Sequence, residues 1–188
     1  MNPDGFPADS DRPPVLAHQR FAADRKSFAG LNLAQCFQRI HDRNLWGAAE
    51  SVSGLGSEID ATAVLRNELP RLLAKLGVRS LLDAPCGDAG WINRSSLAVH
   101  YVGIDIVPGL VGQLQAAAAA GDIRGDYHLA DITVDLLPRC DAILCRDCLV
   151  HLSFANIERA LGNFRRSGAT WLIATTFPGW QTNLDCED

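Results

Sequence analysis

From Arg79 onward the sequence alternates short apolar runs with stretches of helical pattern, and this alternation leaves few folds open. Apolar runs of strand length lie at residues 80–84, 101–106, 127–131, 141–145 and 170–176. Helices are expected between them at residues 91–96, 108–120 and 154–166, the last capped by Ser153. Strands separated by helices pair in parallel, because each connection crosses over the sheet. The predicted fold class is α/β: a mostly parallel sheet of about five strands with helices on both faces.

The chain before Arg79 divides into a tail, an extension and the start of the main domain. Residues 1–14 are polar and proline-rich, and we expect them to be a disordered tail. Residues 15–57 are interpreted as an N-terminal helical extension, with helices near 15–28 and 33–43, followed by a small-residue loop at residues 46–57, named the entry loop. Residues 58–188 then form the main domain.

The first helix of that main domain has recognisable start and stop signals. Ser57 is expected to cap it, with Asp60 three residues later as in a capping box. Pro70 should kink or restart the helix, and Gly77 should end it.

Charge and hydropathy exclude several classes of protein. The 188 residues carry a net charge of −5, so no overall basic field favours a nucleic-acid backbone. No apolar run approaches the roughly 18 residues of a membrane span, and the start of the chain lacks the basic and apolar parts of a secretory signal. We therefore expect a cytoplasmic protein, with no membrane partner and with nucleic acid disfavoured.

The six cysteines predict neither a disulfide framework nor a metal site. Cys145 and Cys148 form a C-x-x-C pair, but a structural zinc site needs four ligands and there is no second paired Cys/His cluster. We expect free thiols that are buried or line a site, because cysteine packs as a small apolar residue.

Acidic residues end four successive predicted strands: Asp83, Asp105, Asp131 and Asp147. In a parallel sheet the carboxyl ends of the strands share one edge, where α/β folds bind ligands. One such residue could be an ordinary turn residue, whereas repetition at four ends indicates a binding site. Asp105 follows Asp83 by about twenty residues, the interval at which such folds place a ribose-binding carboxylate.

The first strand leads into LLDAPCGDAGW, where Gly87 and Gly90 predict a tight turn close to a ligand. A nicotinamide-type G-x-G-x-x-G fingerprint placed on these two glycines would need a third glycine at Pro85. The loop therefore disfavours a nicotinamide oxidoreductase. From this loop alone, a strand-to-helix turn that binds no ligand remains an alternative interpretation.

Taken in order, LLDAPCGDAGW, YVGIDIVP, LADI and CDAILCRDCLVHLS resemble the successive motifs of class I S-adenosylmethionine-dependent methyltransferases, over about residues 46–177. The resemblance implies a Rossmann-like fold, S-adenosyl-L-methionine as the cofactor, and a binding domain at residues 58–188. It places the methionine end at Asp83 and the glycine loop, the ribose at Asp105, and the adenine at Asp131 and Ile132. The cofactor-binding residues it implies are Asp83, Ala84, Pro85, Cys86, Gly87, Gly90, Asp105, Ile106, Asp131, Ile132, Cys145 and Arg146.

The chemistry of this cofactor agrees with the residues. A sulfonium cation requires compensating negative charge in a partly dry pocket. If the acceptor is a hydroxyl, a base assists, and Asp147 and His151 are the candidate catalytic residues. A structural role for His151 stays open. Trp91 is expected either to pack in the core or to offer its ring to a cation.

The resemblance also predicts an incomplete sheet, because full members of the family add an antiparallel hairpin after the fifth strand. Truncation, a partner chain that covers the exposed edge, and a naturally shortened sheet are three explanations. The predicted function is methyl transfer to oxygen or nitrogen of a small-molecule or glycan acceptor. The alternative is a cofactor-binding pseudo-methyltransferase that acts as an interaction module.

Overall fold

The computed structural model describes residues 20–21, 23–177 and 185. The expected disordered tail at 1–14, the beginning of the first expected helix and Cys186 lie outside the described residues.

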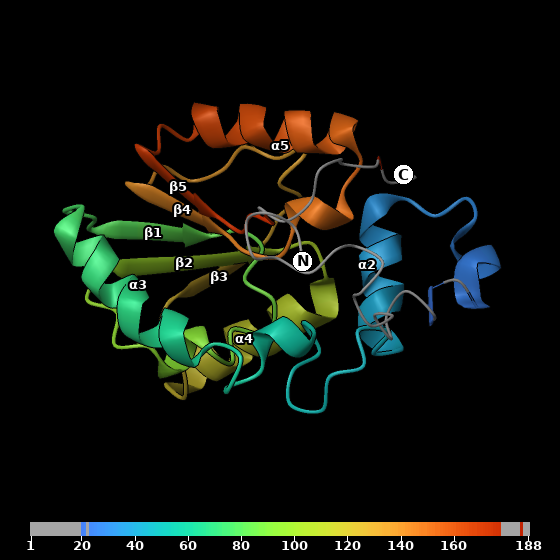
Figure 1. The fold of residues 1–188 in the computed structure, drawn as a ribbon, viewed down its shortest axis with the longest axis horizontal. Helices are drawn as coiled ribbons and strands as arrows, with labels where there is room; N and C mark the ends of the chain where they lie inside the picture. The colour runs from blue at the N-terminus through green and yellow to red at the C-terminus, as the bar shows by residue number, and fades with distance from the viewer. Residues whose placement is uncertain (1–19, 22, 178–184, 186–188) are drawn as a thin grey trace, which may run out of the picture.

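The centre of the molecule is a five-stranded sheet in the order β3-β2-β1-β4-β5, with every neighbouring pair parallel (Figure 1). The strands are β1 (Ser80–Asp83), β2 (His100–Asp105), β3 (Asp126–Leu129), β4 (Ala142–Cys145) and β5 (Trp171–Ala174). All five predicted strands are confirmed. Because β1 lies between β2 and β4, the order of the strands reverses at β1, which is where doubly wound sheets bind ligands.

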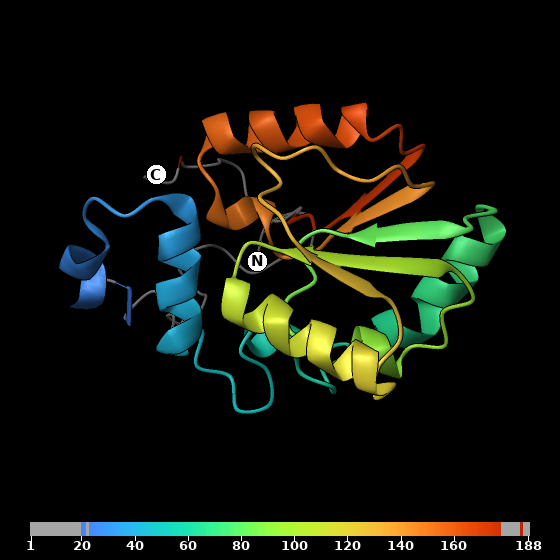
Figure 2. The ribbon, with the colours of Figure 1, turned by 180° about the vertical axis from the view of Figure 1, so that it is seen from behind.

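Helices cover both faces of the sheet, as predicted. Helices α3 (Ala63–Lys75) and α4 (Pro108–Ala120) lie on one face and α5 (Phe154–Arg166) on the other (Figures 1 and 2). Alternate residues of β1, β2 and β4 supply the two cores. Leu81 packs with the α3–α4 core, whereas its neighbour Leu82 packs with the α5 core.

Two helices have the boundaries that the sequence indicates. Helix α4 starts at Pro108 and is followed by Gly121 in the left-handed conformation, with φ of 82°. Helix α5 is capped by Ser153, whose hydroxyl accepts a hydrogen bond from the backbone N–H of Asn156. Within the described part of the chain, no helix is long and apolar enough to cross a membrane.

The predicted start of α3 was wrong. Ser57 ends a short 3₁₀ helix (Leu55–Ser57) instead of capping α3, which begins only at Ala63. The Glu58 carboxylate accepts the N–H groups of Ala49 and Glu50, so this stretch belongs to the entry loop. Helix α3 also continues through Pro70 without restarting.

The end of α3 follows the prediction. Gly77 has φ of 68°, and its N–H bonds to the Ala74 carbonyl. The next residue, Val78, donates its N–H to the carbonyl of Leu73, which completes a Schellman motif.

The helix expected at residues 91–96 is only a single 3₁₀ turn, Ile92–Arg94. The Asn93 side-chain amide donates to the Ala89 carbonyl and to the Tyr127 hydroxyl, both at 3.0 Å. Trp91 and Ile92 are buried in the core. Tertiary contacts thus hold this segment in a short turn.

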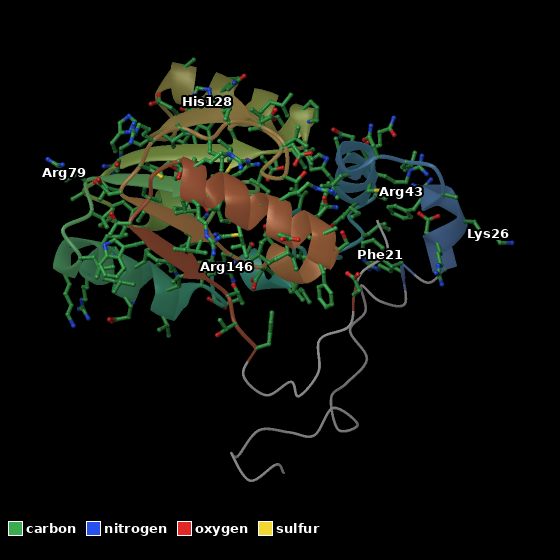
Figure 3. All side chains as sticks on the ribbon, turned by 90° about the horizontal axis from the view of Figure 1, so that it is seen from above. Phe21, Lys26, Arg43, Arg79, His128 and Arg146 are labelled. Carbon is green, nitrogen blue, oxygen red and sulfur yellow. The ribbon has the colours of Figure 1, made fainter. Side chains whose placement is uncertain are left out.

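Helix α2 (Leu33–Asp42) confirms the second helix of the expected extension. Its capping box joins Asn32 and Gln35. Leu33 and Phe37 pack against the core, so the helix lies across the carboxyl ends of the strands (Figure 1). Figure 3 shows Arg79, which precedes β1, and Arg43, which follows α2, at opposite ends of the molecule.

Strand β5 forms one edge of the described sheet, and it carries exposed apolar side chains. Trp171 and Leu172 are 43% and 44% exposed. The sequence predicted this apolar edge.

We predict that Leu82→Ala lowers the free energy of unfolding by about 2–5 kcal/mol, because Leu82 is fully buried at the centre of β1. Leu136→Ala is the matched control: Leu136 is 86% exposed, and its loss should change stability by less than about 0.5 kcal/mol. Urea unfolding of both variants measures the difference. Equal stabilities would contradict the described core.

Candidate functional site

A cavity of about 330 Å³ opens at the carboxyl ends of the strands, within the range of roughly 300–1,000 Å³ typical of small-molecule sites. Its walls come from α2, the entry loop, and the loops that follow β1, β2, β3 and β4. Most of the residues predicted from the sequence line it: Asp83, Pro85, Cys86, Gly87, Asp105, Ile106, Asp131, Ile132, Arg146, Asp147 and His151.

Asp83, Asp105 and Asp131, which follow three neighbouring strands, share this one cavity. The three carboxylates thus meet at one edge of the sheet, as the parallel strands predict. Asp83 and Asp105 are buried, with 2% and 6% of their surface exposed. Two nearly dry carboxylates beside a third create a site that favours a cationic or hydrogen-bond-donating ligand.

The Asp83 carboxylate ends β1 and accepts a hydrogen bond of 2.8 Å from the Tyr101 hydroxyl of β2. Burial raises the pKa of Asp83 to about 7, and the nearby charge of Asp105 acts in the same direction. The Tyr101 hydrogen bond and the positive charge of Arg146 oppose this rise in the pKa.

Asp105 ends β2, and each of its carboxylate oxygens accepts one backbone N–H. Oδ2 accepts from Gly87 and Oδ1 from Val107, both at 3.0 Å. Burial raises the pKa of Asp105, and these backbone hydrogen bonds oppose the rise. The first bond ties the glycine loop to β2. Each oxygen keeps a further lone pair for a ligand.

Asp131 follows β3 in a tight turn of its own. Its Oδ1 accepts hydrogen bonds of 2.7 Å from both the N–H and the hydroxyl of Thr133. The carbonyl of Ile132 accepts a bond of 2.7 Å from the Asn163 amide, which is buried on α5. The sheet and α5 thus fix this wall of the cavity.

The glycine loop has a conformation that differs from the prediction in one detail. Gly87 has φ of 55°, and a Cβ there would lie 2.3 Å from the Ser53 hydroxyl, so only glycine fits. The other left-handed residue of the loop is Ala89, with φ of 51°, rather than Gly90.

Three of the predicted cofactor-binding residues lie outside the cavity lining. Ala84 and Cys145 are buried in the α5 core, because each continues the alternation of its strand away from the α3–α4 face. Gly90 is on the outer side of its loop, where its N–H donates to the Asp88 carboxylate.

The entry loop is fastened over the cavity at two places. At one end, the Ser53 hydroxyl accepts the N–H of Asp88 at 2.9 Å, and the Ser51 hydroxyl donates to the Asp88 carboxylate at 2.6 Å. At the other end, Arg146 donates to the Gly56 carbonyl at 2.5 Å and contacts the Ser57 hydroxyl at 3.4 Å. The loop therefore joins the two segments that follow β1 and β4.

Trp91 has the first of the two roles that the sequence left open, packing in the core, and a contact between its ring and the cation of a cofactor stays a prediction. It is 4% exposed and packs in the core. Its ring also faces a cation, the guanidinium of Arg146, whose Cζ lies 5.6 Å from the ring centroid. Figure 3 labels Arg146 at the carboxyl end of the sheet. This arginine also pairs with Asp147 at 3.0 Å.

The two candidate bases, Asp147 and His151, both line the cavity. Asp147 follows β4 with φ of 47°. His151 ends a short 3₁₀ helix (Leu149–His151), and its ring lies 4.5 Å from the Trp46 ring, centroid to centroid. The geometry brings both side chains to the same part of the cavity as the entry loop.

Sequence reasoning missed the contribution of α2 to this site. Leu33, Phe37, Ile40 and His41 from that helix line the cavity. The amphipathic pattern at residues 33–42 indicated a buried face, but it gave no indication that this face would cover a ligand site. Trp46 was likewise assigned only to the entry loop.

The cysteines among the described residues are buried or half-buried. Cys36, Cys86, Cys140, Cys145 and Cys148 are free thiols, and no group of metal-binding side chains occurs in the described part of the chain. Cys148 is buried and lines the cavity. A hydrogen bond with Cys145, together with burial, raises its pKa well above the usual value, so the thiol stays protonated.

The raised pKa of Asp83 leads to a prediction about stability. The carboxyl group titrates near 3.8 in the unfolded chain and near 7 in the folded protein, so the folded state holds an extra proton between these values. The free energy of unfolding therefore decreases as pH rises through this window, and the contribution is constant above it.

We predict that Asp83→Asn, which keeps an oxygen for Tyr101, removes this dependence. Relative to the variant, wild type should lose more than about 1 kcal/mol of stability between pH 5 and 7. Urea unfolding of both proteins at several pH values measures this difference in the free energy of unfolding. Parallel curves for the two proteins would contradict the raised pKa.

No protein-family model and no curated protein matches this chain. Solved structures do resemble it. The PH0226 protein of Pyrococcus horikoshii OT3 has a TM-score of 0.51 at 16% identity, over 63% of this chain and 60% of that one.

Two further solved structures are methyltransferases by name. NodS of Bradyrhizobium japonicum WM9, an N-methyltransferase solved with S-adenosyl-L-homocysteine, has a TM-score of 0.51 at 16% identity, over 68% of this chain and 65% of that one. The methyltransferase domain of bacterial CtHen1-CN has a TM-score of 0.51 at 11% identity, over 58% of this chain and 63% of that one. The chain thus matches less than two thirds of each similar protein, and it has the Rossmann-like fold of class I methyltransferases.

Proposed function

We propose that this protein binds S-adenosyl-L-methionine and transfers its methyl group to a small-molecule or glycan acceptor, on oxygen or nitrogen. One observation carries the proposal: Asp83, Asp105 and Asp131 converge on a single cavity beside the turn at Gly87. The fold shared with class I methyltransferases supports it.

The Asp105 carboxylate suits a ribose. Its two backbone hydrogen bonds fix its orientation and use one lone pair on each oxygen. The remaining lone pairs form a fork that can accept hydrogen bonds from two vicinal hydroxyl groups. Gly87, which donates one of the backbone bonds, leaves room for Ser53 of the entry loop, because a Cβ there would lie 2.3 Å from the Ser53 hydroxyl.

The Asp83 carboxylate suits the cationic end of the cofactor. It is buried, and its pKa of about 7 lets an arriving ammonium or sulfonium group shift it to the charged form. Among the described residues that line the cavity, Arg146 is the one arginine or lysine, and it already contacts Asp147 and the entry loop. This charge balance disfavours the pyrophosphate of a nicotinamide dinucleotide.

Apolar walls suit the adenine. Ile106 and Ile132 follow β2 and β3 and line the cavity beside Asp131. One oxygen of Asp131 is occupied by Thr133, so the other is the acceptor we assign to the exocyclic amine. Leu33 and Phe37 of α2 add further apolar lining.

The bound cofactor would supply a methyl group activated by the sulfonium. The chain then has to align an acceptor, exclude water and, for a hydroxyl acceptor, take up a proton. Asp147 and His151 are the residues we assign to that last step, because both reach the cavity. The entry loop would exclude water from above.

Ligand binding and turnover test the proposal in sequence. S-adenosyl-L-homocysteine at 100 times its dissociation constant should stabilise the folded protein by about 2.7 kcal/mol, which appears as a raised melting temperature, whereas NAD should not. Methyl-labelled S-adenosyl-L-methionine, incubated with fractionated small metabolites and glycans, should then label a product. Stabilisation without labelling would favour a cofactor-binding interaction module. Absence of stabilisation would refute the proposal.

We predict that Asp105→Asn weakens S-adenosyl-L-homocysteine binding at least about tenfold, because the ribose loses a charged acceptor. Asparagine retains one oxygen for a backbone N–H, so the variant should stay folded. Asp126→Asn, at the exposed amino end of β3, is the matched control and should bind as wild type does. Isothermal titration calorimetry measures both affinities. Equal affinities of the two variants would refute the ribose assignment.

A further inference from the structure

Asp147 has a left-handed backbone conformation that neighbouring groups support. Its φ of 47° is unusual for a residue other than glycine. Asn44, with φ of 43°, is held by its own side chain, which bonds the N–H of Gly47 and the carbonyl of Ala48. Asp147 is held instead by Thr175, which follows β5, and by its neighbour Arg146.

The first support is Thr175, which directly follows β5. Its N–H donates to the Cys145 carbonyl at 3.4 Å, so it continues the pairing of β5 with β4. Its hydroxyl oxygen accepts the N–H of Asp147 at 2.9 Å. Threonine is stiff at χ1, so this hydroxyl has few alternative positions. The end of β5 therefore fixes the backbone of Asp147.

The second support acts on the Asp147 side chain. Arg146 Nη2 lies 3.0 Å from Oδ2 of Asp147. A Cβ placed on Gly56 would lie 2.8 Å from the same oxygen, so the entry loop passes close by. The carboxylate lines the cavity and is 35% exposed. The Asp147 carboxylate therefore lies between the Arg146 side chain and the entry loop at Gly56.

The order of the strands indicates what this carboxylate faces. In the proposed binding mode the ribose lies at the end of β2 and the amino-acid part at the end of β1. Strand β4 pairs with β1 on the side away from β2. Asp147 follows β4, so it borders the space next to the sulfur that the ribose and the amino acid leave open.

We propose that Thr175 is a positioning residue, which holds Asp147 so that its carboxylate faces the methyl group to be transferred. The inference rests on the proposed function, because it presupposes the cofactor. It adds a role for a residue beyond β5 that no motif in the sequence indicated. Thr175 touches neither cofactor nor acceptor in this proposal and acts only through Asp147.

Sinefungin probes this position without an acceptor. In this analogue a carbon that bears an ammonium group replaces the methylated sulfonium, so its positive charge lies where the methyl group would be. S-adenosyl-L-homocysteine lacks any group there. The ratio of the two affinities therefore reports the interaction between Asp147 and the methyl position, independently of the rest of the site.

We expect Asp147→Asn to reduce sinefungin affinity by about 10- to 100-fold relative to S-adenosyl-L-homocysteine, since a charge-assisted bond is lost. Thr175→Val, which removes only the hydroxyl, should reduce the ratio by roughly 3- to 10-fold. Thr175→Ser should restore it. Thr176→Val, the same change at the neighbouring exposed threonine, is the matched control and should behave as wild type. Calorimetry measures all affinities.

Each outcome decides the inference. If wild type binds S-adenosyl-L-homocysteine but Thr175→Val leaves the ratio unchanged, the positioning role is refuted while the proposed function stands. An equal loss of both affinities in Thr175→Val would show a merely structural role and would also refute it. If wild type binds neither compound, the proposed function itself fails. A selective loss that serine restores supports the inference.

Discussion

The parallel pairing of β1 with both β2 and β4 is the constraint on which the site depends. It brings the carboxyl ends of these strands to one edge and reverses the direction of strand order at β1. Asp83 and Asp105 are consequently held by the sheet itself, as the last residues of their strands. Loops would position carboxylates less rigidly, because connecting segments are more mobile than the strands that they join.

Burying two carboxylates close together costs free energy, because each loses its hydration and the charges repel each other. Hydrogen bonds compensate for this cost more fully at Asp105 than at Asp83. Asp105 accepts two backbone N–H groups, whereas Asp83 has one hydroxyl donor from Tyr101 and a raised pKa of about 7. The site is therefore incompletely neutralised in the described chain. A ligand that carries positive charge near β1 would relieve this, and a ligand with phosphate groups would aggravate it.

Local patterns predicted the sheet, α2, α4 and α5, because apolar periodicity and caps such as Ser153 depend on nearby residues. They also predicted which acidic residues meet, since the parallel order brings them together. The prediction failed where contacts between distant residues determine the local structure. Asn93 donates a hydrogen bond to Tyr127, and the expected helix is reduced to one turn. Glu58 accepts the N–H of Ala49, so the residues after Ser57 belong to the entry loop and α3 begins later than expected. The contribution of α2 and the bond between Thr175 and Asp147 depend on tertiary packing alone.

The fastening of the entry loop has a consequence for the order in which the protein acquires its site during synthesis. The contact between Ser51 and Asp88 spans 37 residues, and the one between Arg146 and Gly56 spans 90. Closing such long spans depends on the intervening strands being in place first. A nascent chain that has emerged only as far as β2 thus has the Asp105 carboxylate but not Arg146, the second anchor of the entry loop. The loop can close over the cavity only after the ribosome has released the segment that follows β4.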